Sequence, residues 1–159
     1  MVGRHSRSSA GVLSSVLRMP SQKREEEELM KKAEELLNLV GLASHMHMIA
    51  ENLSYGQQRR LEIARALASD PKLLLLDEPA AGMNEKETDS LYDLIKEVQK
   101  RGVTVLIIEH DMPLVMKLCD RITVLNFGEK LAEGTPDEIQ NNDSVVEAYL
   151  GTEEEEVLA

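Results

Sequence analysis

Four consecutive leucines, Leu73 to Leu76, restrict the fold of this chain more than any other feature of its sequence. Successive side chains of a β-strand point to opposite faces of the sheet, so a strand of this kind is apolar on both faces. Such strands are typical of parallel sheets that helices cover on both sides. A second run, Val103 to Ile108, has the same character. We therefore expect both runs to be buried strands of one mainly parallel sheet.

Helix signals alternate with these strands, as in an α/β domain. A Ser, Thr or Asn followed three residues later by Gln or Glu is a typical helix start, and apolar residues at helical spacing mark a further helix. The predicted helices begin at Glu25, Ser54, Asn84, Asp111, Thr135 and Ser144, and the predicted shorter strands cover Ile122 to Leu125 and Lys130 to Ala132.

Composition favours a soluble globular protein. The chain has 159 residues, of which 42% are hydrophobic and 30% are charged. Its apolar runs fall far short of the roughly 20 residues that cross a bilayer. The apolar stretch Gly11 to Leu17 is interrupted by Ser14 and Ser15, which argues against a secretory signal. We therefore expect the chain to stay in the cytoplasm.

Net charge, the single cysteine and the histidines argue against other classes of function. The net charge of −11 argues against a nucleic-acid surface, because like charges repel. Cys119 is the single cysteine, so we interpret it as a small core residue. His45 and His47 have no cysteine or third histidine near them in the sequence, so we interpret them as loop residues rather than metal ligands.

The leucine strand ends in Asp77, Glu78 and Pro79. Ligands of parallel sheets bind at the carboxyl ends of the strands, so two carboxylates lie where a ligand is expected. One acid there can hold Mg²⁺ through water, and the other can orient or deprotonate an attacking water. From this motif alone, an acidic turn without chemical function is the alternative interpretation, because a buried strand often ends in such a turn.

A second motif, Leu53 to Gln58, opens the helix at Ser54. The Ser54 side chain and the backbone N–H groups around Gly56 stand at a helix N-terminus, which favours an anion such as a phosphate. A well-capped helix is the alternative interpretation. Phosphate chemistry is favoured when three segments are taken together in their order and spacing: this motif, Arg59 to Leu67 and the acidic turn.

These motifs closely resemble the ATPase family of ABC transporters, whose signature is Leu-Ser-Gly-Gly-Gln and is matched here with Tyr55 in the third place. The resemblance extends from Leu29 to Gly151. It implies an incomplete P-loop NTPase (RecA-like) α/β core with a mainly parallel sheet, part of the helical signature subdomain and a small C-terminal α/β extension. The implied divisions are 1–24 (polar, irregular), 25–70 (helical subdomain), 71–133 (ATPase core) and 134–159 (helical extension with acidic tail).

The resemblance also implies roles for particular residues, with ATP and Mg²⁺ as cofactors. Ser54, Gly56 and Gln57 would contact an ATP held by the other subunit of a dimer. Asp77 would organise Mg²⁺ through water and Glu78 would be the general base. His110, after the second strand, resembles the switch histidine that contacts the γ-phosphate. The residues that resemble the D-loop at the dimer interface are Ala81, Gly82, Met83 and Asn84.

The subfamily follows from further likeness, which extends to the 80–84 and 109–112 segments and the tail from Gly134 to Gly151. These resemble ATP-binding subunits of branched-chain amino acid importers. The implied partners are a second ATPase subunit, transmembrane permease subunits and, through the permease, a periplasmic or extracellular substrate-binding protein, with no nucleic acid. The implied location is peripheral, on the cytoplasmic face of the cell membrane.

The phosphate-binding loop is missing from these 159 residues. That loop needs Gly-x-x-x-x-Gly-Lys, and not one glycine here is followed by lysine. We therefore expect a C-terminal portion that does not bind ATP alone. Because the family places its P-loop strand between the strands near Glu109 and at Arg121 to Leu125, we expect a gap there with exposed apolar faces. Two alternatives stay open: a non-catalytic module that pairs with a full-length ATPase subunit, and a soluble ATPase acting in translation or DNA repair.

Overall fold

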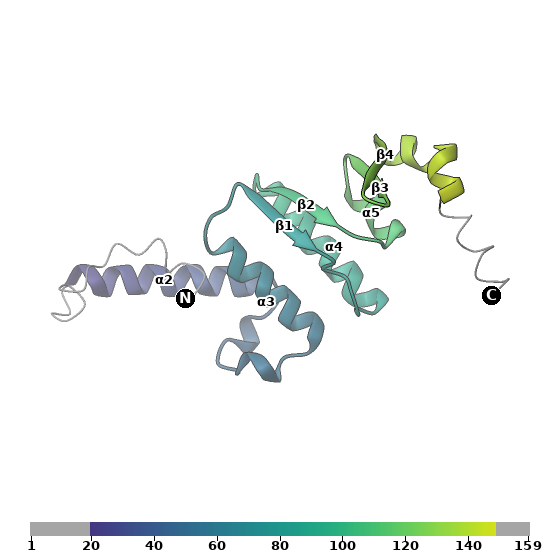
Figure 1. Ribbon diagram of the computed structural model, residues 1–159. Helices are drawn as coiled ribbons and strands as arrows, with labels where there is room; N and C mark the ends of the chain where they lie inside the picture. The colour runs from purple at the N-terminus through teal and green to yellow at the C-terminus, as the bar shows by residue number, and fades with distance from the viewer. Residues whose placement is uncertain (1–19, 149–159) are drawn as a thin grey trace. The chain divides into compact units, whose positions relative to one another are not determined.

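The computed structural model describes residues 20–148. The chain divides into two compact units, Met1–Ile108 and Glu109–Ala159, and the positions of these units relative to one another are not determined (Figure 1). The boundary falls inside the segment 71–133 that the sequence analysis treats as one piece. That four-part division of the chain stays a prediction.

The first unit opens with helix α2, Pro20–Leu39. The predicted start at Glu25, with residues 1–24 irregular, is wrong for 20–24; residues 1–19 lie outside the described part. The first turn of α2 was not predicted because apolar periodicity begins only at Leu29. A helix can nevertheless start at a proline, because the fixed φ of the proline ring suits the first helical position. Two short 3₁₀ turns follow, η2 (Ala43–His45) and η3 (Ala50–Asn52).

Helix α3, Tyr55–Leu67, lies next in the chain and contacts α2. Both helices contribute buried residues, with Leu36 and Val40 near the end of α2 and Ile63 and Leu67 on α3. The predicted helix from Ser54 is confirmed, since Ser54 is its N-cap. The helical part of the unit therefore places the signature at an exposed helix start.

Strands β1 (Leu73–Asp77) and β2 (Thr104–Ile108) pair in parallel, and among the described residues they form a two-stranded sheet. Helix α4, Glu85–Lys100, connects them and contacts β2. Its predicted apolar face is confirmed as core, since the buried side chains of α4 are Leu91, Leu94, Ile95 and Val98.

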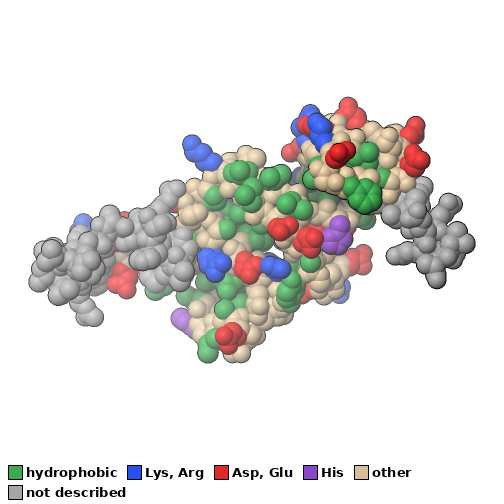
Figure 2. Space-filling view, in the orientation of Figure 1, with side chains coloured by type: hydrophobic (Ala, Val, Ile, Leu, Met, Phe, Trp, Pro, Cys, Tyr) green, Lys and Arg blue, Asp and Glu red, His purple; other side chains and the backbone are tan. Residues whose placement is uncertain are grey.

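The two strands are not buried on both faces, and that prediction is wrong. Leu75 and Leu106 lie opposite one another in the register, and they are 64% and 57% exposed. Leu73 and Ile108, on the same face, are also exposed. Figure 2 shows apolar side chains gathered over β1 and β2. The physical reason is that no layer covers this face within the described residues.

The second unit contains α5 (Met112–Leu118), the antiparallel pair β3 (Ile122–Asn126) and β4 (Glu129–Gly134), and α6 (Pro136–Gln140). Residues 143–148 form a further helix, and the predicted end of that helix at Leu150 lies outside the described residues. Cys119 packs against the buried core of this unit, as predicted. Within the described residues β3 pairs only with β4, and the expected gap in the sheet stays a prediction.

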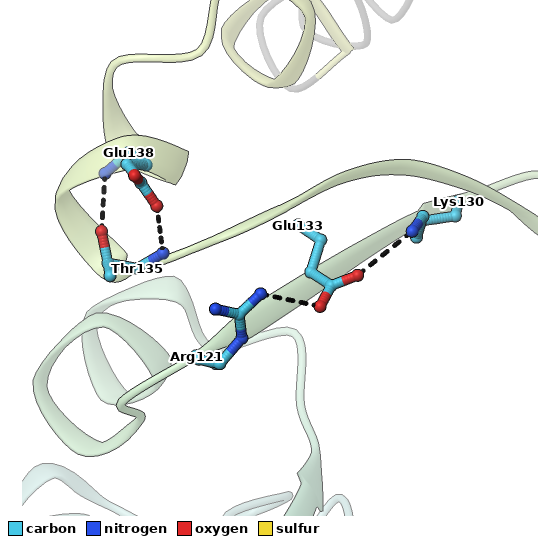
Figure 3. A network of polar contacts seen from close by, with 5 residues as sticks. All are labelled: Arg121, Lys130, Glu133, Thr135 and Glu138. Carbon is cyan, nitrogen blue, oxygen red and sulfur yellow. Dashed lines mark hydrogen bonds and ion pairs between the residues drawn. The ribbon is translucent and has the colours of Figure 1, made fainter.

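Polar contacts fix the end of the β3–β4 pair and the start of α6 (Figure 3). The Glu133 carboxylate accepts from Arg121 at 2.9 Å and from Lys130 at 3.1 Å. The hydrogen bond from Arg121 is the main reason that the pKa of Glu133 is lowered. At the start of α6, the Thr135 backbone N–H donates to Glu138 at 2.8 Å and lowers the pKa of that carboxyl.

Every helix in residues 20–148 is too short or too polar to span a lipid bilayer.

Candidate functional site

The signature residues form the capped start of α3. The Gln57 backbone N–H donates to Ser54 Oγ at 3.4 Å, and the Ser54 backbone N–H donates to Gln57 Oε1 at 3.0 Å. This reciprocal pair is a capping box, which holds the first turn in one conformation. The remaining N–H groups of the turn have no partner inside the helix and stand at the positive end of its dipole. The predicted anion-favouring geometry is therefore present.

Tyr55, which departs from the family pattern, has a defined place. Its hydroxyl accepts hydrogen bonds from the Arg59 guanidinium at 2.9 and 3.2 Å, and that guanidinium lies 5.2 Å from the centre of the ring. Arg59 also pairs with Glu62 at 2.9 Å. The hydrogen bond to Glu62, followed by the one to Tyr55, raises the pKa of Arg59. Tyr55 is thus attached to the surface of its own helix.

Gly56 lies against the start of α4. A methyl group added at Gly56 would stand 2.7 Å from Glu87 Oε1. The Glu87 carboxylate has its own function there, because its Oε2 accepts from the backbone N–H of Asn84, the N-cap of α4. Only glycine fits between the two helix starts with Glu87 in this position. A structural reason for glycine therefore exists beside the phosphate contact that the resemblance implies.

The two acids lie at the carboxyl end of β1, and both side chains are exposed. Asp77 is the last residue of the strand, in register with Ile108. Glu78 has φ of +43°, a conformation that non-glycine residues rarely adopt and that costs about 1–3 kcal/mol. Its backbone N–H donates to the carbonyl of Ile108 at 2.9 Å. The neighbouring strand thus holds Glu78 in a strained conformation, as is common at functional sites.

The turn after Glu78 leads directly to α4. The Ala81 N–H donates to the Glu78 carbonyl at 3.2 Å, and Gly82 takes φ of +72°, which glycine adopts without strain. A methyl group at Gly82 would lie 3.5 Å from the Tyr55 ring, so this turn is a neighbour of the signature. The structure therefore brings together most of the predicted residues of the first unit, namely Ser54, Gly56, Gln57, Ala81, Gly82, Met83 and Asn84.

His110 belongs to the second unit, so no distance to Glu78 is defined. Its backbone N–H is 3.3 Å from Glu109 Oε2. Asp111 is the N-cap of α5 and accepts from the Leu114 N–H at 3.0 Å, as predicted. The role that the resemblance implies for His110 rests on its position in the chain, directly after β2.

A Mg²⁺ ion would find two adjacent carboxylates, Asp77 and Glu78, at this sheet edge. Within residues 20–148 no group of three or more His, Cys, Asp and Glu side chains gathers as a metal site. Mg²⁺ is commonly held by one or two carboxylates together with substrate phosphates and water. The donor set present therefore fits a magnesium ion that arrives with a nucleotide.

His45 is a residue whose neighbourhood the sequence analysis missed. Its Nε2 lies 3.5 Å from Gln57 Nε2, and its Nδ1 lies 3.0 Å from Ser44 Oγ. One signal was available, a histidine shortly before the signature, but no periodicity connects positions 45 and 57. The 3₁₀ turn η2 brings them together.

Comparisons with known proteins agree with these motifs. A family model described as ABC transporter matches residues 3–81, and one described as branched-chain amino acid ATP-binding cassette transporter matches residues 129–155. The chain is 48% identical over 152 residues to the high-affinity branched-chain amino acid transport ATP-binding protein LivG of Escherichia coli (strain K12), covering 95% of this chain and 60% of that protein. The corresponding protein BraF of Pseudomonas aeruginosa is 47% identical with the same coverage.

Solved structures give the same result. The ATP-binding cassette MJ1267 in its ADP conformation has a TM-score of 0.75 and 30% identity, over 94% of this chain and 60% of that one. A nucleotide-free ATP-binding cassette from an ABC transporter has a TM-score of 0.75 and 31% identity, over 93% and 60%. The chain thus spans about 60% of the length of the proteins it matches.

Proposed function

The chain belongs to the ATP-binding subunits of ABC transporters, in the branched-chain amino acid group, and we propose that it serves ATP hydrolysis that drives import of branched-chain amino acids. The observation that carries this proposal is the carboxyl edge of β1. There Asp77 and the strained Glu78 stand exposed, anchored through the Ile108 carbonyl. Glu78 is the strained member of this pair of adjacent acids; backbone strain is common at functional sites, and a positioned carboxylate can act as a general base.

Each residue then has a chemical task. The Glu78 carboxylate accepts the proton of a water whose oxygen forms the new bond to the γ-phosphorus, while the bond to the bridging oxygen breaks and ADP leaves. Asp77 holds Mg²⁺ through water, and the ion supplies charge to the phosphates when it is bound. His110 contacts the γ-phosphate from the segment after β2.

The signature acts on a nucleotide held by a second ATPase subunit. Ser54, the N-cap of α3, is exposed, and Gln57 closes the capping box, while Gly56 is buried against Glu87. The turn of Ala81, Gly82, Met83 and Asn84 lies beside the signature and forms the rest of the dimer interface. The further partners are permease subunits and a substrate-binding protein that acts through them. The subunit works at the cytoplasmic face of the membrane.

A second function is favoured by one observation about these 159 residues, which is that no glycine is followed by lysine. The polypeptide therefore offers no cradle of backbone N–H groups and lysine to the β- and γ-phosphates. In this form it acts as a non-catalytic module, which completes the site on a full-length partner through Ser54 and Gly56 and does not bind ATP alone.

The test is a titration of Mg·ATP against the 159-residue polypeptide, and then against its mixture with a full-length ATPase subunit of the same group. We expect no measurable Mg·ATP binding by the polypeptide alone. In the mixture we expect additional binding, meaning binding beyond that of the full-length subunit alone. Ser54→Arg removes the additional binding, because its side chain fills the phosphate position. Ser90→Arg, on the exposed surface of α4, is the matched control and leaves it unchanged.

Two results contradict the proposal. Micromolar binding by the polypeptide alone shows that the missing loop is not needed. Additional binding that is the same in Ser54→Arg and Ser90→Arg shows that the signature does not act on the partner's nucleotide.

A further inference from the structure

The Gln57 side chain is held from two sides. Its carbonyl oxygen accepts from the Ser54 backbone N–H at 3.0 Å, and its nitrogen lies 3.5 Å from His45 Nε2. A carboxamide is planar, so a contact at the nitrogen also orients the oxygen. The contact is partly buried and joins residues twelve positions apart, unlike the local bonds of the capping box. His45 thus restrains a group on which the start of α3 depends.

The donors and acceptors of this chain assign the state of the imidazole. The Gln57 NH₂ group only donates, so His45 Nε2 is the acceptor in their contact. A neutral imidazole has one donor and one acceptor, so the proton lies on Nδ1. Nδ1–H then donates to Ser44 Oγ, at 3.0 Å. The chain Ser44–His45–Gln57–Ser54 therefore has one consistent arrangement of donors and acceptors, with the His45 proton on Nδ1.

We propose that His45 is a positioning residue for the signature. It keeps the Gln57 carboxamide turned with its oxygen toward Ser54, and so fixes the backbone and hydroxyl of Ser54 where the phosphate contact forms. This inference rests on the proposed function, in which Ser54 faces a nucleotide. Without His45 the carboxamide rotates freely, and the Ser54 N–H exchanges its partner for water. A small misplacement of a positioning group has large effects on binding and rate.

The first experiment does not depend on ATP. Nitrogen-15 spectra of the 159-residue polypeptide report the tautomer of His45, and we expect the proton on Nδ1. His45→Leu shifts the Gln57 side-chain amide and speeds hydrogen exchange of the Ser54 backbone amide. His45→Gln restores both, because its carbonyl oxygen offers an acceptor of similar reach. His47→Leu, an exposed histidine of the same segment, is the matched control and moves neither signal.

The second experiment uses the mixture with a full-length ATPase subunit. We expect His45→Leu to weaken the additional Mg·ATP binding about tenfold, which corresponds to about 1.4 kcal/mol, and His45→Gln to recover most of it. A proton on Nε2, or a Gln57 amide that does not respond to His45→Leu, overturns the inference.

The outcomes of the two proposals are distinguishable. If Ser54→Arg abolishes the additional binding and His45→Leu leaves it intact, the positioning role is wrong and the proposed function stands. If neither Ser54→Arg nor His45→Leu changes the additional Mg·ATP binding, the proposed function fails. The inference then fails with it, whatever the spectra show.

Discussion

The backbone N–H of Glu78 donates to the carbonyl of Ile108 at 2.9 Å, so the last residue of β2 holds the turn that follows β1. Glu78 is thereby kept at φ of +43°, outside the range that its side chain prefers. Strand pairing, rather than local preference, determines where this carboxylate stands. The same relationship makes the backbone position of residue 78 sensitive to changes in the sheet, whereas a change of its side chain leaves this backbone hydrogen bond in place.

Glu78→Gln separates binding from hydrolysis in the complete subunit assembled with its membrane partners. The amide has the shape of the carboxylate but does not accept the proton of the attacking water. We expect ATP binding to be kept and turnover to fall by a factor of roughly 10² or more. Glu97→Gln, at the far end of α4, is the matched control. A Glu78→Gln subunit with near-normal turnover contradicts the general-base role.

Gly56→Ala tests the contact between the two helix starts. Alanine favours helix over glycine by up to about 1 kcal/mol, but its methyl group displaces Glu87 from Asn84. Losing a cap costs about 1 kcal/mol, so the net change of the single variant is small. The informative quantity is the coupling energy with Glu87→Ala. We expect about 1 kcal/mol from urea unfolding of the four proteins; additive effects would show that the contact does not form.

Two leucine substitutions compare the free energy of unfolding lost at a buried position of α4 and at an exposed position of β1. Leu91 is fully buried on α4, so Leu91→Ala should lower the free energy of unfolding by about 2–5 kcal/mol. Leu75 is 64% exposed, so Leu75→Ala should cost less than about 1 kcal/mol in the 159-residue polypeptide. Urea titrations at equal protein concentration measure both. Equal costs would mean that the Leu75 face is covered in solution.

The lowered pKa values of Glu133 and Glu138 give a pH dependence with a defined sign. Both carboxylates are stabilised in the folded state, so their contribution is complete above the ordinary glutamate pKa and is lost as pH falls toward the lowered values. The effect is small because both groups are exposed. We expect Tm to fall less between pH 6 and about pH 3 in Glu133→Gln than in the wild type. An identical fall would show that the contacts to Arg121 and Lys130 add no stability.

Elements whose signals are local were predictable from the sequence. The caps at Ser54, Asn84 and Asp111 lie within three residues of the groups they satisfy, so their patterns are complete in the sequence. The apolar stripe of α4 was likewise readable, since its period places all its members on one face. The first turn of α2 was missed because polar residues carry no such period.

Features that depend on distant segments were not predictable in the same way. The four leucines predicted a strand, but whether Leu73 and Leu75 are buried depends on what covers the sheet. The left-handed conformation of Glu78 arises from pairing with β2. Glutamate has no preference for this conformation, so the residue type at position 78 does not predict it. The contact of His45 with Gln57 needs the 3₁₀ turn that brings them together.

The capping boxes at Ser54, Asn84 and Thr135 also bear on the order of events in folding. Each closes within a single turn, so it forms with little loss of chain entropy and on the time scale of helix formation. The β1–β2 ladder joins Leu73 to Thr104 across the whole of α4, and such non-local pairing forms slowly. We therefore expect the signature turn to exist before the acidic turn acquires its conformation. A newly made chain would form the helix start at Ser54 first and the turn at Glu78 last.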